Sequence, residues 1–126
     1  MHDDSTICAI ATPPGSGAIS IIRISGKDAY DICGKIIRFR NSKKRIKGLK
    51  PYTIHYASII YNDQLIDEVL VSLFRAPYSY TGEDVIEISC HGAHYIQQQI
   101  PQSFSCFIFI NAVNPAGFPC LIRGVI

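Results

Sequence analysis

The chain has 126 residues, of which 48% are apolar and 17% are charged, and its formal net charge is +2. This composition is typical of a single globular domain and excludes a disordered tail or a strongly basic nucleic-acid binder. No run of about 18 apolar residues occurs, and the polar start lacks the features of a signal peptide, so we expect a cytosolic protein without membrane contact. The five cysteines are widely spaced, which favours neither a disulfide framework nor a zinc ribbon.

The first half of the chain predicts strands around one helix. Two apolar, β-branched runs at 7–11 and 18–25 flank a stretch rich in Pro and Gly, as in a strand, a loop and a second strand. Apolar residues then recur with the spacing of one helical face, which predicts a helix over about 27–37. The runs 52–61 and 65–74 predict a hairpin. Because the second run is apolar on both faces, we expect it to be a central strand covered on both sides.

The second half of the chain predicts one more strand and one more helix. A polar, turn-rich loop at 75–84 precedes the run 85–90, which alternates so that Glu87 and Ser89 share an accessible face. A helix should start near Ala93, and Pro101 should interrupt it. The order β-β-α-β-β-β-α predicts an α+β domain with two or three helices on a mixed, largely antiparallel sheet.

The glycine-rich stretch Gly15-Ser16-Gly17 follows a strand, a position from which backbone amides can bind an anion. The alternative is a loop shaped only by proline and glycine geometry, and we favour this alternative. A GTP-binding P-loop is excluded, since neither Gly26-Lys27 nor Gly34-Lys35 is followed by Ser or Thr.

Zinc-binding residue types come together at Cys90, His91 and His94, but no fourth ligand is evident, so we expect no metal site. Cys90 shares the strand parity of buried neighbours and should pack in the core rather than act as a nucleophile. The carboxylates Asp67-Glu68 and Glu83-Asp84 are candidates for acid–base chemistry, or they cap turns. We assign no catalytic residue.

Two charged features of the sequence stand out. Residues 35–50 hold eight Lys or Arg and no acidic residue, which predicts either a solvated surface or a contact with nucleic-acid phosphates. Arg23 lies inside an apolar strand, where a guanidinium needs a carboxylate or a ligand beside it. Arg23 is therefore the residue from which a binding site is best sought.

Four segments at 6–15, 21–26, 67–70 and 80–92 carry a family resemblance. The last of them contains Tyr80-Thr81-Gly82-Glu83-Asp84-Val85-Ile86-Glu87 and ends in Cys90-His91-Gly92. Over about residues 4–100 the chain resembles the N-terminal domain of the tRNA-modification GTPase family called MnmE or TrmE. The resemblance implies a fold related to the folate-binding domain of aminomethyltransferases. It also implies a homodimer that holds 5-formyltetrahydrofolate or 5,10-methylenetetrahydrofolate near its interface.

The resemblance also implies residue roles. By their places in the matching motifs, Arg23 would contact an anionic or polar part of the folate, and Glu68 would line the pterin or its approach. The loop residues Tyr80, Thr81, Gly82 and Glu83 would line the same region. Further pocket residues implied in this way are Glu87, His91 and Gly92.

For the full-length family, the resemblance implies tRNA and the flavoprotein MnmG as partners in modifying the wobble uridine. The motifs of the GTPase domain are absent from this sequence, so we do not expect this chain alone to hydrolyse GTP. Whether the chain is an enzyme by itself is left open.

From Pro101 onward the sequence departs from the family pattern. We therefore divide the chain into a folate-binding and dimerisation domain at 1–100 and a divergent tail at 101–126. We hypothesise that the tail is a frameshifted reading of a longer gene. Two alternatives to the folate function stay open, namely an RNA-contacting or assembly module that uses residues 35–50, and an inert truncated product.

Overall fold

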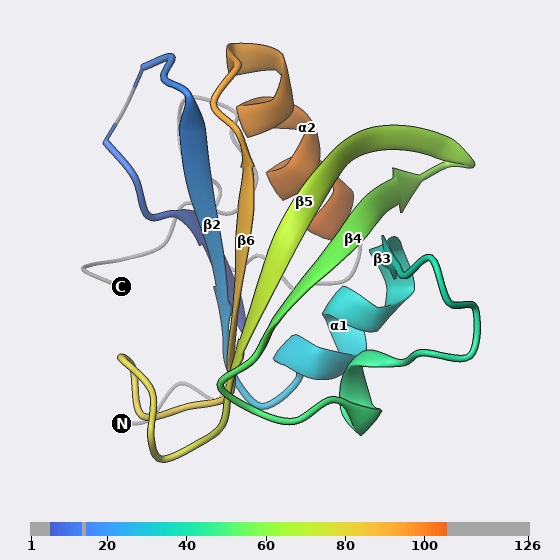
Figure 1. Ribbon diagram of the computed structural model, residues 1–126. Coiled ribbons are helices and arrows are strands. Elements are labelled where there is room, and N and C mark those ends of the chain that lie inside the picture. Colours follow the sequence, from blue (N-terminus) through green and yellow to red (C-terminus); the bar gives the residue numbers. More distant parts are fainter. Residues whose placement is uncertain (1–5, 14, 106–126) are drawn as a thin grey trace.

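A computed structural model of the chain describes residues 6–13 and 15–105, with side chains up to residue 100 (Figure 1). Its strands form one sheet in the order β1-β2-β6-β5-β4-β3. The strands are β1 (Ile7–Ile10), β2 (Ile19–Ser25), β3 (Ile37–Arg38), β4 (Ile54–Tyr61), β5 (Gln64–Phe74) and β6 (Val85–His91). The helices are α1 (Ala29–Ile36) and α2 (His94–Ser105), with a short 3-10 turn, η1 (Ile46–Gly48).

The predicted α+β architecture and order of elements are confirmed, with β3 as an additional short strand at the sheet edge. All neighbouring strands in the described part of the chain pair antiparallel, in keeping with the expected mixed, largely antiparallel sheet. The chain reaches this arrangement because its hairpins place consecutive strands side by side. The return of β6 between β2 and β5 then joins the two halves of the sheet.

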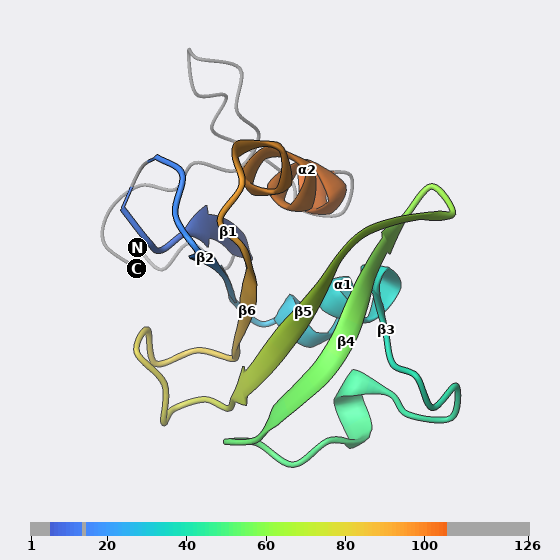
Figure 2. The same ribbon diagram turned by 45° about the horizontal axis from the view of Figure 1, so that its top comes forward.

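Both helices pack on one face of the sheet (Figure 2). The core between the helices and this face consists of fully buried apolar side chains, among them Ile22, Ile24, Ile36, Ile59, Val71, Leu73, Ile86, Ile88 and Ile100. Successive strand residues point to opposite faces, so the same strands present their other side chains to the uncovered face. We call this second surface the open face.

The prediction that β5 is covered on both sides was wrong. Val69, Val71 and Leu73 are buried beneath the helices, whereas Leu70 on the open face is 47% exposed. Although β5 is apolar on both of its faces, only one of the two faces is buried within this chain. The hairpin itself is confirmed, with a two-residue turn at Asn62 and Asp63, both at positive φ, as a type I′ turn requires.

The helix predicted at 27–37 is confirmed as α1, but the predicted break at Pro101 was wrong. α2 begins at His94 and continues through Pro101 to Ser105. A proline inside a helix removes one backbone donor and bends the helix, and the helix can continue on either side of it. Nothing in the described part of the chain forms a helix long and apolar enough to cross a membrane. Our hypotheses on the tail fall mainly on residues 106–126, outside the described residues.

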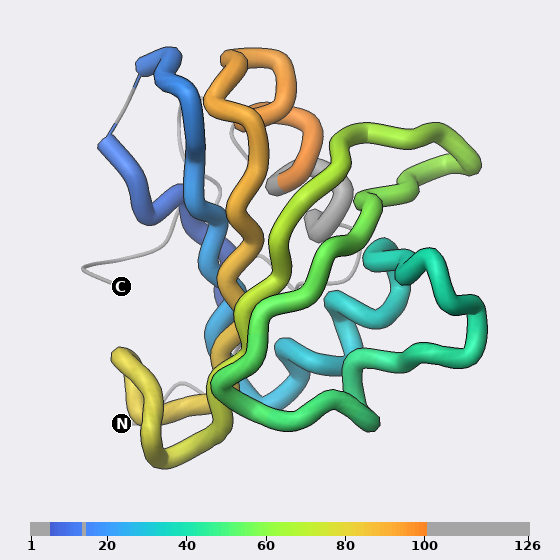
Figure 3. The backbone as a smooth tube through the Cα atoms, in the orientation of Figure 1, coloured from blue at the N-terminus to red at the C-terminus, as the bar shows by residue number. Residues whose placement is uncertain are grey.

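The basic segment 35–50 leaves α1, passes through β3 and makes a long excursion at the β3–β4 edge of the sheet (Figure 3). Most of its side chains are exposed, as predicted. Two apolar side chains anchor it, because Ile46 is only 3% exposed and Phe39 packs against the core. Lys47 also forms an ion pair with Asp31 of α1.

The surroundings of two glycines predict opposite effects of alanine substitution on the free energy of unfolding. A Cβ on Gly92 would lie 2.2 Å from the Gly17 carbonyl oxygen, whereas a Cβ on Gly34 in α1 would meet nothing within 4 Å. We expect Gly92→Ala to lower the free energy of unfolding by about 2–3 kcal/mol through overpacking. Gly34→Ala should raise it by about 0.5–1 kcal/mol through helix propensity. Urea unfolding measures both, and equal effects would contradict the close packing of Gly92 against Gly17.

Candidate functional site

Arg23 on β2 and Glu87 on β6 face each other across the sheet. The Arg23 Nε and Nη2 atoms lie 2.9 and 2.7 Å from the same carboxylate oxygen, Glu87 Oε1. The two side chains are only 13% and 22% exposed. Of the two partners that the sequence left open for Arg23, a carboxylate or a ligand, the structure shows the carboxylate of Glu87. The accessible face predicted for Glu87 is the open face.

The loop at 75–84 lies at one end of this pair, where β5 ends and β6 begins (Figure 1, yellow). It brings Tyr80 over the Arg23 guanidinium, whose Cζ lies 5.2 Å from the ring centroid. The Tyr80 side chain is 88% exposed, so its outer face is open to a ligand. A ring held beside a cation in this way forms a platform on which a planar molecule can stack.

Ser25 of β2 holds the tip of the loop. Its Oγ lies 2.7 Å from Thr81 Oγ1 and donates a 2.7 Å hydrogen bond to Glu83 Oε2. Gly82 between them has a φ of 77°, a conformation that favours glycine. Thr81, Gly82 and Glu83 therefore fix the shape of the loop that presents Tyr80.

The base of the loop is closed by a second charged pair. Arg75 Nη1 lies 3.1 Å from Asp84 Oδ2, and the Ala76 N–H donates to Asp84 Oδ1. The Arg75 guanidinium also stacks on Tyr30 of α1, 3.7 Å from the ring centroid. Tyr30 donates from its hydroxyl to the Phe74 carbonyl, and burial raises its pKa to about 12. The loop is thus fastened to the sheet at both of its ends and at its tip.

Apolar side chains surround the Arg23–Glu87 pair on the open face. The strand register places Ile21, Ser89, Leu70 and Tyr56 in one row across the sheet, and Arg23, Glu87, Ser72 and Ile54 in the next. Ile54 is 66% exposed and Tyr56 is 55% exposed. Ile19, one row beyond Ile21 on β2, is also largely exposed.

Glu68 lies on the β4 side of the open face, opposite Ser58. Tyr56 donates a hydrogen bond to the Glu68 carboxylate, and this bond is the main reason why the pKa of Tyr56 is raised. Burial acts in the same direction, and the nearby Arg40 opposes it. Glu68 is therefore accessible from the open face but belongs to a different part of it than Arg23.

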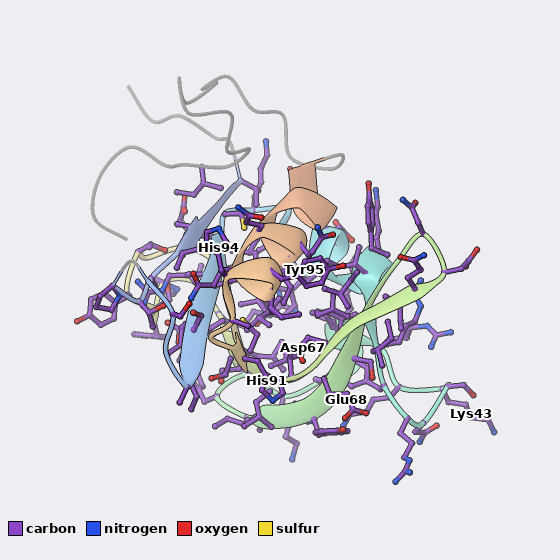
Figure 4. All side chains as sticks on the ribbon, turned by 90° about the horizontal axis from the view of Figure 1, so that it is seen from above. Lys43, Asp67, Glu68, His91, His94 and Tyr95 are labelled. Atoms are coloured by element: carbon purple, nitrogen blue, oxygen red, sulfur yellow. The ribbon has the colours of Figure 1, made fainter. Side chains whose placement is uncertain are left out.

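His91 lies at the far end of β6 from the loop, beside Asp67 (Figure 4). The imidazole Nδ1 is 2.7 Å from Asp67 Oδ1, and the backbone N–H of His91 donates to Asp67 Oδ2. The Glu68 N–H also donates to Asp67 Oδ1. Asp67 is only 9% exposed, whereas the His91 side chain is 72% exposed. One buried carboxylate thus holds an imidazole whose other edge faces solvent.

The structure brings together only part of the predicted site. Arg23 and Glu87 form one cluster with the loop residues Tyr80, Thr81, Gly82 and Glu83. Glu68, His91 and Gly92 lie toward the other end of the sheet, since His91 lies four residues after Glu87 along β6, a span of about 13 Å. Gly92 contributes a close backbone contact, because its N–H donates to the Ala18 carbonyl and its carbonyl accepts from Gly17.

The sequence did not indicate that Ser25 and Asp67 belong to these two clusters. Ser25 has the strand parity of Arg23, which was a usable signal for a side chain on the same face. For Asp67 the sequence indicated acid–base chemistry, turn capping or membership of the 67–70 motif, but no role as a site residue. Its contact with His91 joins β5 to β6 across 24 positions of the sequence, so no local pattern indicated it.

Cys90 points into the core, as predicted. It is 4% exposed and donates to the Ser20 carbonyl, and burial followed by the charge of Asp67 raises its pKa to about 11. The thiol therefore stays protonated at neutral pH. Nowhere in residues 6–13 and 15–105 do three His, Cys, Asp or Glu side chains converge as metal ligands.

The loop Gly15-Ser16-Gly17 is held by the protein itself. The Gly17 N–H donates to the Gly92 carbonyl, and the buried Gln97 of α2 donates from Nε2 to the Gly15 carbonyl and to Ser20 Oγ. These contacts favour the loop of purely structural character over an anion site.

Comparison with known proteins gives the family. The model of a family described as "GTP-binding protein TrmE N-terminus" matches residues 6–115, which is most of the chain. The chain belongs to this family. It is 55% identical over 100 residues to the tRNA modification GTPase MnmE of Parabacteroides distasonis, and 55% identical over 102 residues to that of Bacteroides fragilis. The MnmE protein of Enterococcus faecalis is 50% identical over 99 residues.

These matches cover 79%, 81% and 77% of this chain, but only 22%, 22% and 21% of the relatives. The chain thus spans about a fifth of the length of the curated relatives it matches. The match to the TrmE N-terminal family establishes that this chain contains a domain that occurs in tRNA modification GTPases. The roles of the individual site residues stay predictions.

The Asp67 carboxylate should matter more to stability than the imidazole that it holds. Asp67→Ala leaves the backbone donors of Glu68 and His91 without their acceptor, so we expect a loss of about 2–4 kcal/mol in the free energy of unfolding. His91→Ala removes an exposed ring and should cost below about 1 kcal/mol. Urea unfolding of the two variants tests this order, and a larger effect of His91→Ala would contradict it.

Proposed function

We propose that this chain is the tetrahydrofolate-binding and dimerisation domain of a tRNA-modification GTPase that acts on the wobble uridine. Its ligand would be 5-formyltetrahydrofolate or 5,10-methylenetetrahydrofolate, bound on the open face at the Arg23–Glu87 pair. The single observation that carries this proposal is the position of that pair beneath Tyr80. GTP hydrolysis and the partnership with tRNA and a flavoprotein would belong to the full-length protein, in the cytosol.

The hydrogen-bonding groups of the pair suit a pterin. Both bonds from Arg23 go to Glu87 Oε1, so no described protein group bonds Glu87 Oε2 or Arg23 Nη1. A carboxylate oxygen beside a guanidinium N–H offers an acceptor next to a donor. The pyrimidine edge of a pterin has the complementary order, an amino group and ring N–H beside a carbonyl oxygen. Tyr80 would stack on the plane of the same ring.

A second copy of the chain would complete this site. A hollow of about 410 Å³ lies at the basic segment near the β3 edge of the sheet, and Arg23 does not line it. A flat face needs another wall before it can enclose a ligand. The exposed side chains of Ile19, Ile54, Tyr56 and Leu70 give the open face the apolar surface that a two-fold dimer would bury.

The roles of the other predicted residues follow from their places. Thr81, Gly82 and Glu83 would position the loop through Ser25 rather than contact the pterin with their bonded groups. Glu68 and His91 would meet the distal part of the ligand, or residues of the second copy, toward the other end of the face.

Isothermal titration of the 126-residue chain with 5-formyltetrahydrofolate tests the proposal. We expect Arg23→Ala to weaken binding by about 10- to 100-fold, because a charge-assisted contact is lost. Lys27→Ala, which removes an exposed cation just beyond β2, serves as the matched control and should bind as the unsubstituted chain does. The absence of binding to the unsubstituted chain, or equal affinity of the Arg23 variant, would refute the assignment.

A further inference from the structure

The basic segment encloses a hollow of about 410 Å³ that lies four strands away from Arg23 in the sheet order. Its apolar wall comes from the end of α1, from β3 and from η1. Its rim carries the cationic and polar side chains of the loop between them. The lining residues are Gly34, Ile37, Arg38, Phe39, Asn41, Ser42, Lys44, Arg45 and Ile46.

The described part of the protein does not neutralise the charge of this hollow. Within the described ranges, no carboxylate lies within ion-pair distance of Arg38, Lys44 or Arg45. Asp31, the acidic residue next to the segment, is already paired with Lys47. The rim of the hollow is therefore a concentrated positive field.

The cations at the rim are held in place by uncharged groups. Arg38 donates from Nη1 to the carbonyls of Gly34 and Ile37, at 3.2 and 3.1 Å. Arg45 donates from Nη1 to the carbonyls of Ser42 and Lys44. In both guanidinium groups, Nε and Nη2 bond no described protein acceptor. Each arginine is thus positioned while most of its donors are left for an external anion.

Lys44 completes the rim. Its Nζ lies 5.0 Å from the centroid of the Phe39 ring, and that ring packs edge-to-face on His55 of β4. The charge of Lys44 reaches His55, because burial and this charge together lower the pKa of the imidazole. Lys44 therefore lies beside one fixed aromatic side chain, on the rim of the hollow that Arg38 and Arg45 also line.

We propose that Arg38, Lys44 and Arg45 form the centre of a phosphate-binding surface that holds the backbone of RNA. A linear polyanion fits better than a single phosphate, because positive charge continues along the segment through Arg40 and Lys43. Figure 4 shows Lys43 at the outer end of the segment. The assignment of this polyanion as RNA rests on the proposed function in tRNA modification. The phosphate chemistry itself rests on the geometry of the segment.

The surface would act separately from the folate site. It lies at the β3 edge, whereas the Arg23–Glu87 pair lies on β2 and β6, about 15–20 Å away across the sheet. Arg40 lies close enough to act on Tyr56, so the segment borders the open face at β4. An RNA backbone on this edge would thus run beside the open face without occupying it.

Fluorescence anisotropy of a labelled, unmodified tRNA transcript, titrated with the 126-residue chain at several salt concentrations, tests the proposal. We expect Arg38→Gln/Lys44→Gln/Arg45→Gln to weaken binding at least tenfold and to flatten the slope of log K against log salt concentration by about 2, as for three lost phosphate contacts. The matched control Lys27→Gln/Lys47→Gln/Lys50→Gln removes the same charge from exposed positions outside the hollow and should change affinity by less than about threefold.

A second variant distinguishes the loss of positive charge from a loss of the folded structure. Arg38→Lys/Arg45→Lys keeps the charge and should keep the salt slope, and circular dichroism checks that all variants fold. Equal losses in the two triple variants, an unchanged slope, or binding of inorganic phosphate without binding of tRNA would overturn the proposal. Folate titration of the same triple variants should be unaffected, so failure of the folate proposal and failure of this one give different results.

Discussion

The ion pair between Arg23 of β2 and Glu87 of β6 is the interaction on which the arrangement of the open face depends. Arg23 and Glu87 are mostly buried, and charges in such a setting persist only when they are paired. The β2–β6 register places the two residues opposite each other, and Ser25, two residues along β2, anchors the loop that carries Tyr80 over the guanidinium. A single register thus fixes the charge pair, the loop and the aromatic platform together. A slip of one residue would turn Arg23 into the core.

The division of the sheet into a covered and an open face separates stability from binding. Ile22, Ile86 and their buried neighbours pack under α1 and α2, so the helical side supplies most of the apolar burial. The open face keeps apolar side chains such as Leu70 exposed, and these are available to a partner and a ligand. The basic segment adds a third region at the β3 edge, where charge rather than apolar area would decide what binds.

Much of this fold could be predicted from local patterns, because alternation and helical spacing act within a few residues. Arg23 in an apolar strand required a carboxylate or a ligand, and the parity of Glu87 placed that residue on an accessible face. Leu70 misled the prediction, because an apolar residue exposed on an open face has the same sequence signal as one buried in the core. The contact of Asp67 with His91 joins residues 24 positions apart and depends on strand pairing, so no local pattern contained it.

The central claim is that the open face around Arg23 and Glu87 is the binding and dimerisation surface, and sedimentation velocity tests it most directly. Leu70→Glu places a charge in the middle of this face, whereas Leu65→Glu makes the same change at the hairpin end of β5, at a comparably exposed side chain. The account predicts that the unsubstituted chain and the Leu65 variant sediment as dimers and that the Leu70 variant sediments as a monomer. A monomeric unsubstituted chain, or a Leu70 variant that stays dimeric, would contradict it.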